Sequence, residues 1–300
     1  MTRRDPAGLA GSRFTQKDET MQLFDSHSHL NEKSLTEEDL AFRIEEIEAD
    51  EDLLYVMDIG YDLVSSKLAA AHAANYDWCF AAVGYHPSDA SYFGNEEYEA
   101  IKTLAAQPGV KAIGEIGLDY HYEGFSKDDQ WECFRRQIRL ANELAMPICI
   151  HARDADQDVM DILKEEGAFS KERKAMFPER SVPEGWEKGA KDARVVLHCF
   201  SGSAELARQY VDLGATISLA GPVTFKNARK SVDVALAIPP EFLLVETDAP
   251  YLAPVPMRGK PNRSPYVVHT ARRIAVLKHM SVEELAAITC ANAKRFYGID

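Results

Sequence analysis

Short apolar runs alternate with longer amphipathic stretches from about residue 22 to the end of the chain. Eight runs carry the β-branched and aromatic residues typical of buried strands: 22–25, 53–59, 78–83, 110–116, 147–150, 194–198, 215–219 and 242–247. Helical spacing is clearest between them, at 35–50, 127–145, 154–166, 203–213 and 228–237. Strands that alternate with helices pair in parallel, because a parallel neighbour requires a crossover connection. Eight repeats predict an α/β fold, a closed (β/α)8 TIM barrel, with an open doubly wound sheet as the alternative.

Three polar segments interrupt this alternation. Residues 1–20 lack apolar periodicity, so we expect a flexible N-terminal extension followed by a single barrel domain over residues 21–300. Residues 167–193 contain prolines and glycines and lengthen one connection beyond the usual few residues. Residues 249–265 are rich in proline and follow the eighth predicted strand, which predicts a rigid, irregular loop.

Composition narrows the classes of protein to which the chain can belong. Hydrophobic residues make up 46% of the 300 positions, which suits a large core, and no apolar run approaches the length of a membrane span. The first residues contain no apolar stretch of the kind that a secretory signal needs. Five scattered cysteines without a CxxC pair predict buried, reduced thiols, so we expect a cytoplasmic monomer without a membrane partner. The net charge of −14 argues against a protein that coats nucleic acid with its whole surface.

Polar side chains of one chemical kind fall at the ends of several predicted strands. In a parallel barrel these ends share one face, where active sites lie. The residues in question are His27 and His29 after the first run, Glu115 in the fourth, His151 after the fifth, His198 at the end of the sixth and Asp248 after the eighth. Imidazole and carboxylate together suit one or two divalent ions such as Zn²⁺, Mn²⁺ or Mg²⁺. The spacing therefore predicts a metal site at this face.

The motifs around these residues resemble those of the TatD family of metal-dependent deoxyribonucleases, which belong to the amidohydrolase-like barrels. The matching segments are FDSHSHL (24–30), GYHP (84–87), GEIGLDY (114–120), PICIHARDA (147–155), VLHCFSG (196–202), GPVTFKNARK (221–230), ETDAPYLAPVP (246–256) and RGKPN (258–262). The resemblance runs from about Met21 to the C-terminus. It implies that His27 and His29 bind one metal and that Glu115 is shared between two.

The same resemblance implies that His151 and His198 bind the second metal, and that Asp248 is both a ligand and the catalytic acid and base. Two features depart from the family pattern. Many relatives have Glu-Pro after the asparagine at position 262, where this chain has Arg263 and Ser264. The segment 167–193 is also longer than is usual in the family, and we expect it to cover or extend the rim of the active site.

A two-metal site of this kind implies hydrolysis by an activated water. Asp248 and Glu115 are then the catalytic residues, with Asp248 accepting the proton of the water and Glu115 holding the metals together. Residues expected to contact the substrate are His86, Arg153, Arg258 and Lys260. The same rim also carries Lys226, Arg229, Lys230 and Arg263, which locally offset the acidic remainder of the chain.

Three classes of function agree with these residues. The first is a deoxyribonuclease that cleaves phosphodiester bonds at the ends of DNA. The alternative is a barrel hydrolase of another ester or amide, such as an aminoacyl-tRNA. The third is a binding protein that keeps the barrel without catalysis, against which the complete set of metal-ligand residues argues.

Overall fold

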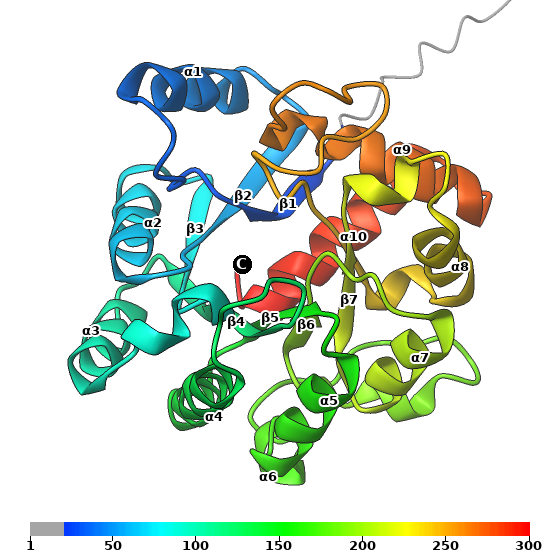
Figure 1. Ribbon diagram of the computed structural model, residues 1–300. Helices are drawn as coiled ribbons and strands as arrows, with labels where there is room; N and C mark the ends of the chain where they lie inside the picture. Colours follow the sequence, from blue (N-terminus) through cyan, green and yellow to red (C-terminus); the bar gives the residue numbers. More distant parts are fainter. Residues whose placement is uncertain (1–20) are drawn as a thin grey trace, which may run out of the picture.

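The computed structural model describes residues 21–300, so the predicted extension over residues 1–20 lies outside the described part of the chain. Eight parallel strands follow one another around a barrel in the order of the sequence (Figure 1). Their bounds are β1 Leu23–Ser28, β2 Leu53–Ile59, β3 Cys79–Val83, β4 Val110–Asp119, β5 Ile148–Arg153, β6 Val195–Leu197, β7 Thr216–Leu219 and β8 Leu243–Val245. A parallel bridge between Ser28 and Ala249 joins the segment that follows β8 back to the first strand. The predicted TIM barrel is confirmed, and the open sheet is excluded.

Ten α-helices surround the strands in the described residues, and most of them form an outer ring (Figure 1). Their bounds are α1 Glu37–Glu48, α2 Leu63–Asn75, α3 Asn95–Ala105, α4 Lys127–Glu143, α5 Asp156–Glu165, α6 Lys171–Lys174, α7 Ala204–Asp212, α8 Arg229–Ala237, α9 Val267–Lys278 and α10 Val282–Tyr297. Several begin where a short polar side chain accepts a hydrogen bond from the first turn. Thr36 caps α1, Ser126 caps α4 and Ser203 caps α7. No helix of residues 21–300 is long and apolar enough to cross a membrane.

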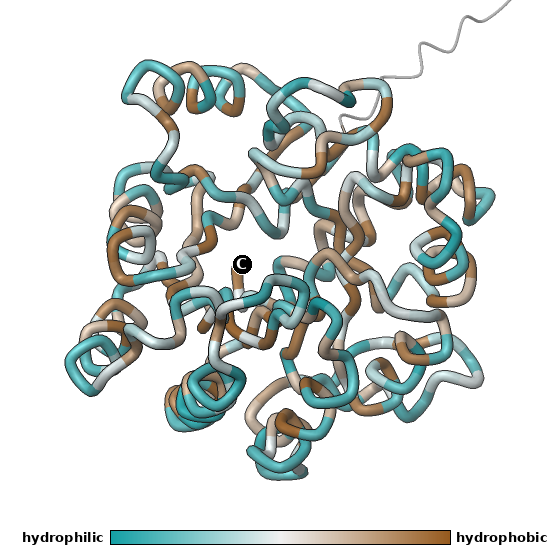
Figure 2. Tube along the Cα trace, viewed as in Figure 1, coloured by the Kyte–Doolittle hydropathy of each residue, from teal (hydrophilic) through white to brown (hydrophobic). Residues whose placement is uncertain are grey.

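The interior of the barrel is filled by side chains that alternate along the strands. Phe24, Met57, Cys149 and Leu244 belong to one buried cluster, together with the last turns of α10. The hydroxyl of Tyr297 in α10 donates a hydrogen bond to the Ser26 carbonyl, 3.0 Å away. Figure 2 shows hydrophobic residues along the strands and hydrophilic ones on the outer sides of the surrounding helices. The interior of the barrel is therefore a packed core, and α10 covers one end of it. The opposite end, at the carboxyl ends of the strands, is where a site can form.

The segment 167–193 does not reach the rim, and our expectation that it covers the active site is wrong. It contains the short helix α6, and two buried arginines attach it to the bottom of the barrel. Arg173 donates to the carbonyls of Ala193 and Met146, and Arg180 donates to the Ala215 carbonyl and the Thr216 hydroxyl. The physical reason is connectivity, because a link from a helix to the next strand arrives at the amino-terminal end of that strand, opposite the active face.

Candidate metal centre

The six residues predicted as metal ligands converge at the carboxyl ends of the strands. His27 lies in β1, Glu115 in β4 and His151 in β5. His29 and His198 directly follow β1 and β6, and Asp248 lies three residues after the end of β8. Glu115 was expected at the end of its strand, but β4 continues to Asp119, so this carboxylate lies within the strand. Two groups of these residues have ligand atoms within 4.8 Å of one another: His27, His29 and Asp248, and His27, Glu115 and His198.

Close approach of β4 to β5 holds Glu115 and His151 side by side. Gly117 pairs with His151 across the two strands and has a φ of +149°. A Cβ atom at Gly117 would lie 1.9 Å from the His151 carbonyl oxygen, so no larger residue fits there without displacing the strand. The GEIGLDY segment thus needs its second glycine to bring the carboxylate next to the histidine.

The two carboxylate oxygens of Glu115 face two different groups of histidines. Its Oε1 lies 2.7 Å from His151 Nδ1 and 2.7 Å from His198 Nε2. Its Oε2 lies 3.5 Å from His27 Nε2 and 3.8 Å from His29 Nε2. Asp248 Oδ1 completes the second group at 3.5 Å from His29 Nε2. Glu115 therefore occupies the position of a carboxylate that can bridge two cations.

Ring orientation shows that the facing nitrogens are suited to bind metal. His29 Nδ1 lies 2.8 Å from the Ile59 carbonyl, which can only accept, so in the neutral ring the lone pair is on Nε2. That Nε2 lies 3.3 Å from His27 Nε2. Two ligands about 2.1 Å from one tetrahedral ion lie about 3.4 Å apart. Because the observed separations are close to this value, the donor set fits a divalent ion.

Histidines and carboxylates in this cluster hold one another in charged forms, although burial opposes this. Burial alone would raise the pKa of Glu115, but the charge of His198 and hydrogen bonds from His151 and His198 hold it well below its usual value. Burial would lower the pKa of His29, yet its bond to Asp248 and the charges of Glu115 and Asp248 raise it to about 9. The pKa of Asp248 is lowered, against burial, mainly by His29. The carboxylates are thus ionised and attract cations, which displace protons from the histidines.

His86 lies next to these residues but is oriented as a donor. Its Nδ1 accepts a hydrogen bond from the Ser88 backbone at 3.1 Å, so in the neutral ring the proton is on Nε2. Burial, and then the charge of His151, lowers the pKa of His86 to about 3, which keeps the ring neutral. The Nε2 atom lies 4.0 Å from Glu115 Oε1. His86 can therefore donate a hydrogen bond to a molecule bound at this face, as the sequence predicted for a substrate contact.

Two carboxylates behind the histidines were not among the predicted site residues. Asp119 Oδ2 lies 3.3 Å from His151 Nε2, the nitrogen opposite the one that faces Glu115. Glu246 Oε1 lies 3.5 Å from His198 Nδ1 and accepts a hydrogen bond from the Cys199 backbone. Carboxylates in this position orient metal-binding imidazoles and raise their basicity. For Asp119 the sequence held a signal, since it lies four residues after Glu115 in the same strand, where residues i and i+4 point to the same side.

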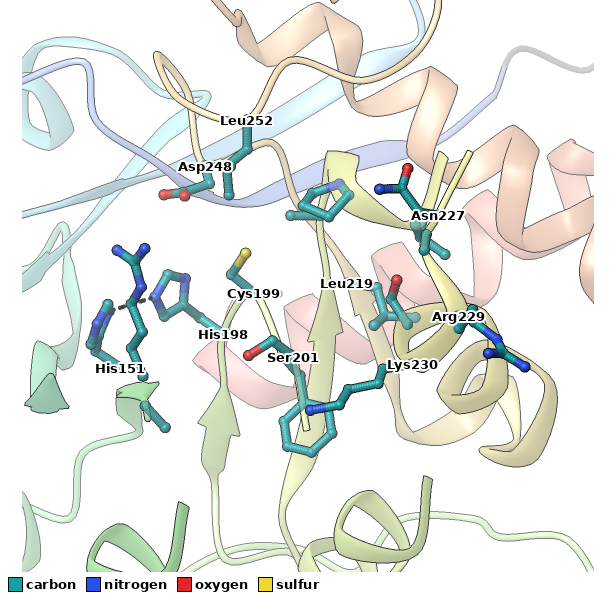
Figure 3. Close-up of a pocket in the computed structure, with 18 residues that line it drawn as sticks. His151, His198, Cys199, Ser201, Leu219, Asn227, Arg229, Lys230, Asp248 and Leu252 are labelled. Atoms are coloured by element: carbon teal, nitrogen blue, oxygen red, sulfur yellow. Dashed lines mark hydrogen bonds between the residues drawn. The ribbon is translucent and has the colours of Figure 1, made fainter. Parts of the chain in front are cut away.

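A cavity of about 530 Å³ adjoins the cluster, and His151, His198 and Asp248 line it together with residues of the loop before α8 (Figure 3). Arg153 lines the cavity, as do Arg229 and Lys230 at the start of α8. Cys199 also lines it and is only partly buried, unlike the other four cysteines, so the expectation of uniform burial is wrong for this thiol. Its exposure follows from its place in the turn after β6 instead of within a strand.

The remaining predicted cations lie outside this cavity. Arg258 is exposed and packs over the Phe225 ring at 4.1 Å, and Lys260 and Lys226 are exposed. Arg263 does not contribute a free charge to the rim, because its guanidinium pairs with Glu46 at 2.6 Å. Its neighbour Ser264 is buried and hydrogen-bonds the Ser28 hydroxyl at 3.2 Å, so both residues that depart from the family pattern have structural contacts here.

Comparison with known proteins shows the family to which the chain belongs. A family profile described as "TatD related DNase" matches residues 24–298. A protein of Bacillus subtilis (strain 168) named "Uncharacterized metal-dependent hydrolase YabD" is 43% identical over 278 residues, covering 93% of this chain and 100% of the relative. A protein of Klebsiella pneumoniae (strain 342) named "3'-5' ssDNA/RNA exonuclease TatD" is 35% identical over 246 residues, covering 80% of this chain and 85% of the relative.

Among solved structures, YJJV, a TatD homologue from Escherichia coli K12, superimposes with a TM-score of 0.77 at 22% identity. The match covers 94% of this chain and 100% of that one, and it supports the barrel fold. A (β/α)8 barrel with convergent histidines and carboxylates defines a metal-dependent hydrolase. The chain belongs to the TatD family of these enzymes.

Proposed function

We propose that His27, His29, Glu115, His151, His198 and Asp248 hold two divalent cations, and that the chain cleaves phosphodiester bonds at the ends of DNA strands. The observation that carries the proposal is the placement of Glu115. One of its oxygens faces His151 and His198, and the other faces His27 and His29. Mg²⁺, Mn²⁺ and Zn²⁺ are the candidate ions for such a mixture of imidazoles and carboxylates.

When bound, two such ions lower the pKa of a water toward neutrality and neutralise charge on a phosphate. We assign to Asp248 the role of accepting the proton of the attacking water, because its lowered pKa keeps the carboxylate ionised and it lies beside His29. The same carboxyl group then returns a proton to the leaving oxygen. His86, neutral and with Nε2–H facing the cluster, donates a hydrogen bond to a phosphate oxygen. Arg153 supplies positive charge beside His151.

Charge supports a phosphodiester as substrate over a neutral ester. The chain carries a net charge of −14, yet the cavity next to the cluster is lined by Arg153, Arg229 and Lys230. Within residues 21–300, none of these three cations forms an ion pair with a carboxylate. Free cations beside a catalytic cluster attract a polyanion and raise its local concentration. The Klebsiella relative, named an exonuclease of single-stranded DNA and RNA, has a function of this kind.

The test uses end-labelled single-stranded DNA, double-stranded DNA, RNA and a neutral carboxylic ester, with protein loaded with Mg²⁺, Mn²⁺ or Zn²⁺. The proposal predicts stepwise shortening of DNA with at least one metal and none in chelator. Cleavage of the ester without cleavage of any DNA would transfer the assignment to the alternative, a hydrolase of esters such as an aminoacyl-tRNA. Activity on neither substrate by fully metal-loaded protein would refute both.

A further inference from the structure

The cavity beside the metal centre has one apolar side. Phe200 and Leu219 line it after β6 and in β7, Val223 follows β7, and Leu252 follows β8. Figure 3 places Leu219 on the far side of Cys199 from His151, and Leu252 beside Asp248. The volume of about 530 Å³ falls within the roughly 300–1,000 Å³ typical of pockets for small organic ligands. A nucleobase and its sugar are ligands of suitable size and polarity for such a surface.

The side of the cavity opposite the histidines is polar and cationic. Asn227, Arg229 and Lys230 line it at the start of α8, and in Figure 3 the Lys230 amine extends back toward Ser201. Asp248 is the only carboxylate among the lining residues. The metal cluster and this cationic end are thus two separate sites for negative charge, with the apolar surface between them.

We propose that this cavity receives the terminal nucleotide of a strand whose end carries a phosphate group. The phosphodiester to be cleaved lies at the metal cluster, the base lies against Phe200 and Leu219, and the terminal phosphate binds Lys230, with Ser201 as a further donor. The inference rests on the proposed nuclease function, and it adds a preference for phosphorylated over hydroxyl ends. Either a 3′-phosphate or a 5′-phosphate supplies this chemistry.

The kinetic test compares one single-stranded oligonucleotide with a 3′-phosphate, a 5′-phosphate or two hydroxyl ends. We expect kcat/KM to be roughly 2- to 5-fold higher for one phosphorylated end, as an ion pair with an exposed lysine implies. Lys230→Gln should abolish the preference, and rising salt should reduce it. Lys226→Gln is the matched control, because this lysine is likewise exposed, precedes α8 by three residues and does not line the cavity, so its replacement should leave the preference intact.

A binding test separates this inference from the nuclease proposal. Titration calorimetry measures the affinity of the metal-loaded protein for a nucleoside 3′,5′-bisphosphate and for both corresponding monophosphates. The bisphosphate should bind roughly 2- to 5-fold more tightly than either, and Lys230→Gln should remove the difference. If DNA is cut with no preference for either phosphorylated end, the inference is overturned and the nuclease remains. If no DNA is cut, equal binding of the three nucleotides overturns the inference, whereas tighter binding of the bisphosphate supports it without the nuclease.

Discussion

Replacement of Asp248 by asparagine isolates the proposed proton acceptor from the rest of the fold. The residue has a φ of +57°, a left-handed conformation that asparagine tolerates far better than most residues. Its backbone N–H donates to the His27 carbonyl at 2.9 Å, and this bond does not depend on the side chain. The side chain contacts His29, 3.5 Å away, and His27, 3.9 Å away. The substitution therefore removes charge and basicity while it preserves shape.

The expected loss combines two effects. A general base contributes roughly 100- to 10,000-fold to the rate of proton transfer steps, so we expect kcat on single-stranded DNA to fall by at least about 100-fold. Weaker metal binding adds to the loss at limiting metal, because Asp248 faces one of the two groups of ligands. Saturating metal should restore occupancy but not kcat. Folding should change little, because the side chain is held by no partner outside the site.

The assay measures kcat across a series of metal concentrations, together with metal content and thermal unfolding of the variant. Asp248→Ala is the comparison for the backbone, because alanine is strained at this positive φ and should unfold at a lower temperature than Asp248→Asn. A fully metal-loaded Asp248→Asn protein that cuts DNA at near the wild-type rate would show that another group accepts the proton, and the assignment of Asp248 would then be wrong.

Three further predictions concern stability and the groups behind the metal ligands. Arg173→Ala should lower the free energy of unfolding by about 2–4 kcal/mol in chemical denaturation, because it leaves carbonyl groups without donors. Lys171→Ala, on the exposed side of α6, should change the free energy of unfolding by less than about 0.5 kcal/mol. Removal of divalent ions by a chelator should lower the Tm by roughly 5 °C or more, since the ions bind only the folded chain, and an unchanged Tm in calorimetry would argue against a metal site. Asp119→Asn should weaken metal affinity about 10- to 100-fold in competition titrations, and an unaltered affinity would show that Asp119 does not orient His151.

The sequence predicted the architecture because the barrel depends on short-range patterns. Each strand is a short apolar run, and each helix has its own periodicity and cap, as Thr36 and Ser126 illustrate. The metal-ligand residues could also be predicted from the sequence, because the carboxyl ends of parallel strands share one face whatever the register of the strands. Five of the six predicted ligands accordingly fall in two overlapping groups, and the sixth, His151, lies 2.7 Å from Glu115.

What the sequence did not reveal depends on contacts between distant segments. The role of Arg173 and Arg180 at the bottom of the barrel follows from carbonyls of other loops, and nothing in the local pattern distinguishes these residues from surface cations. Arg263 was placed on the rim from its position in the chain alone, but its partner Glu46 is more than 200 positions away. His86 is oriented as a donor by its contact with Ser88. It comes close to Glu115 only because the barrel closes.

The most direct test of the two-metal centre is anomalous scattering from crystals of the full chain grown with Mn²⁺. The account predicts two peaks at the carboxyl ends of the strands, about 3.5–4 Å apart as in other two-metal sites, with the Glu115 carboxylate between them. One peak should lie next to His27, His29 and Asp248, and the other next to His151 and His198. A single peak outside these residues, or no peak at full Mn²⁺ saturation, would contradict the account.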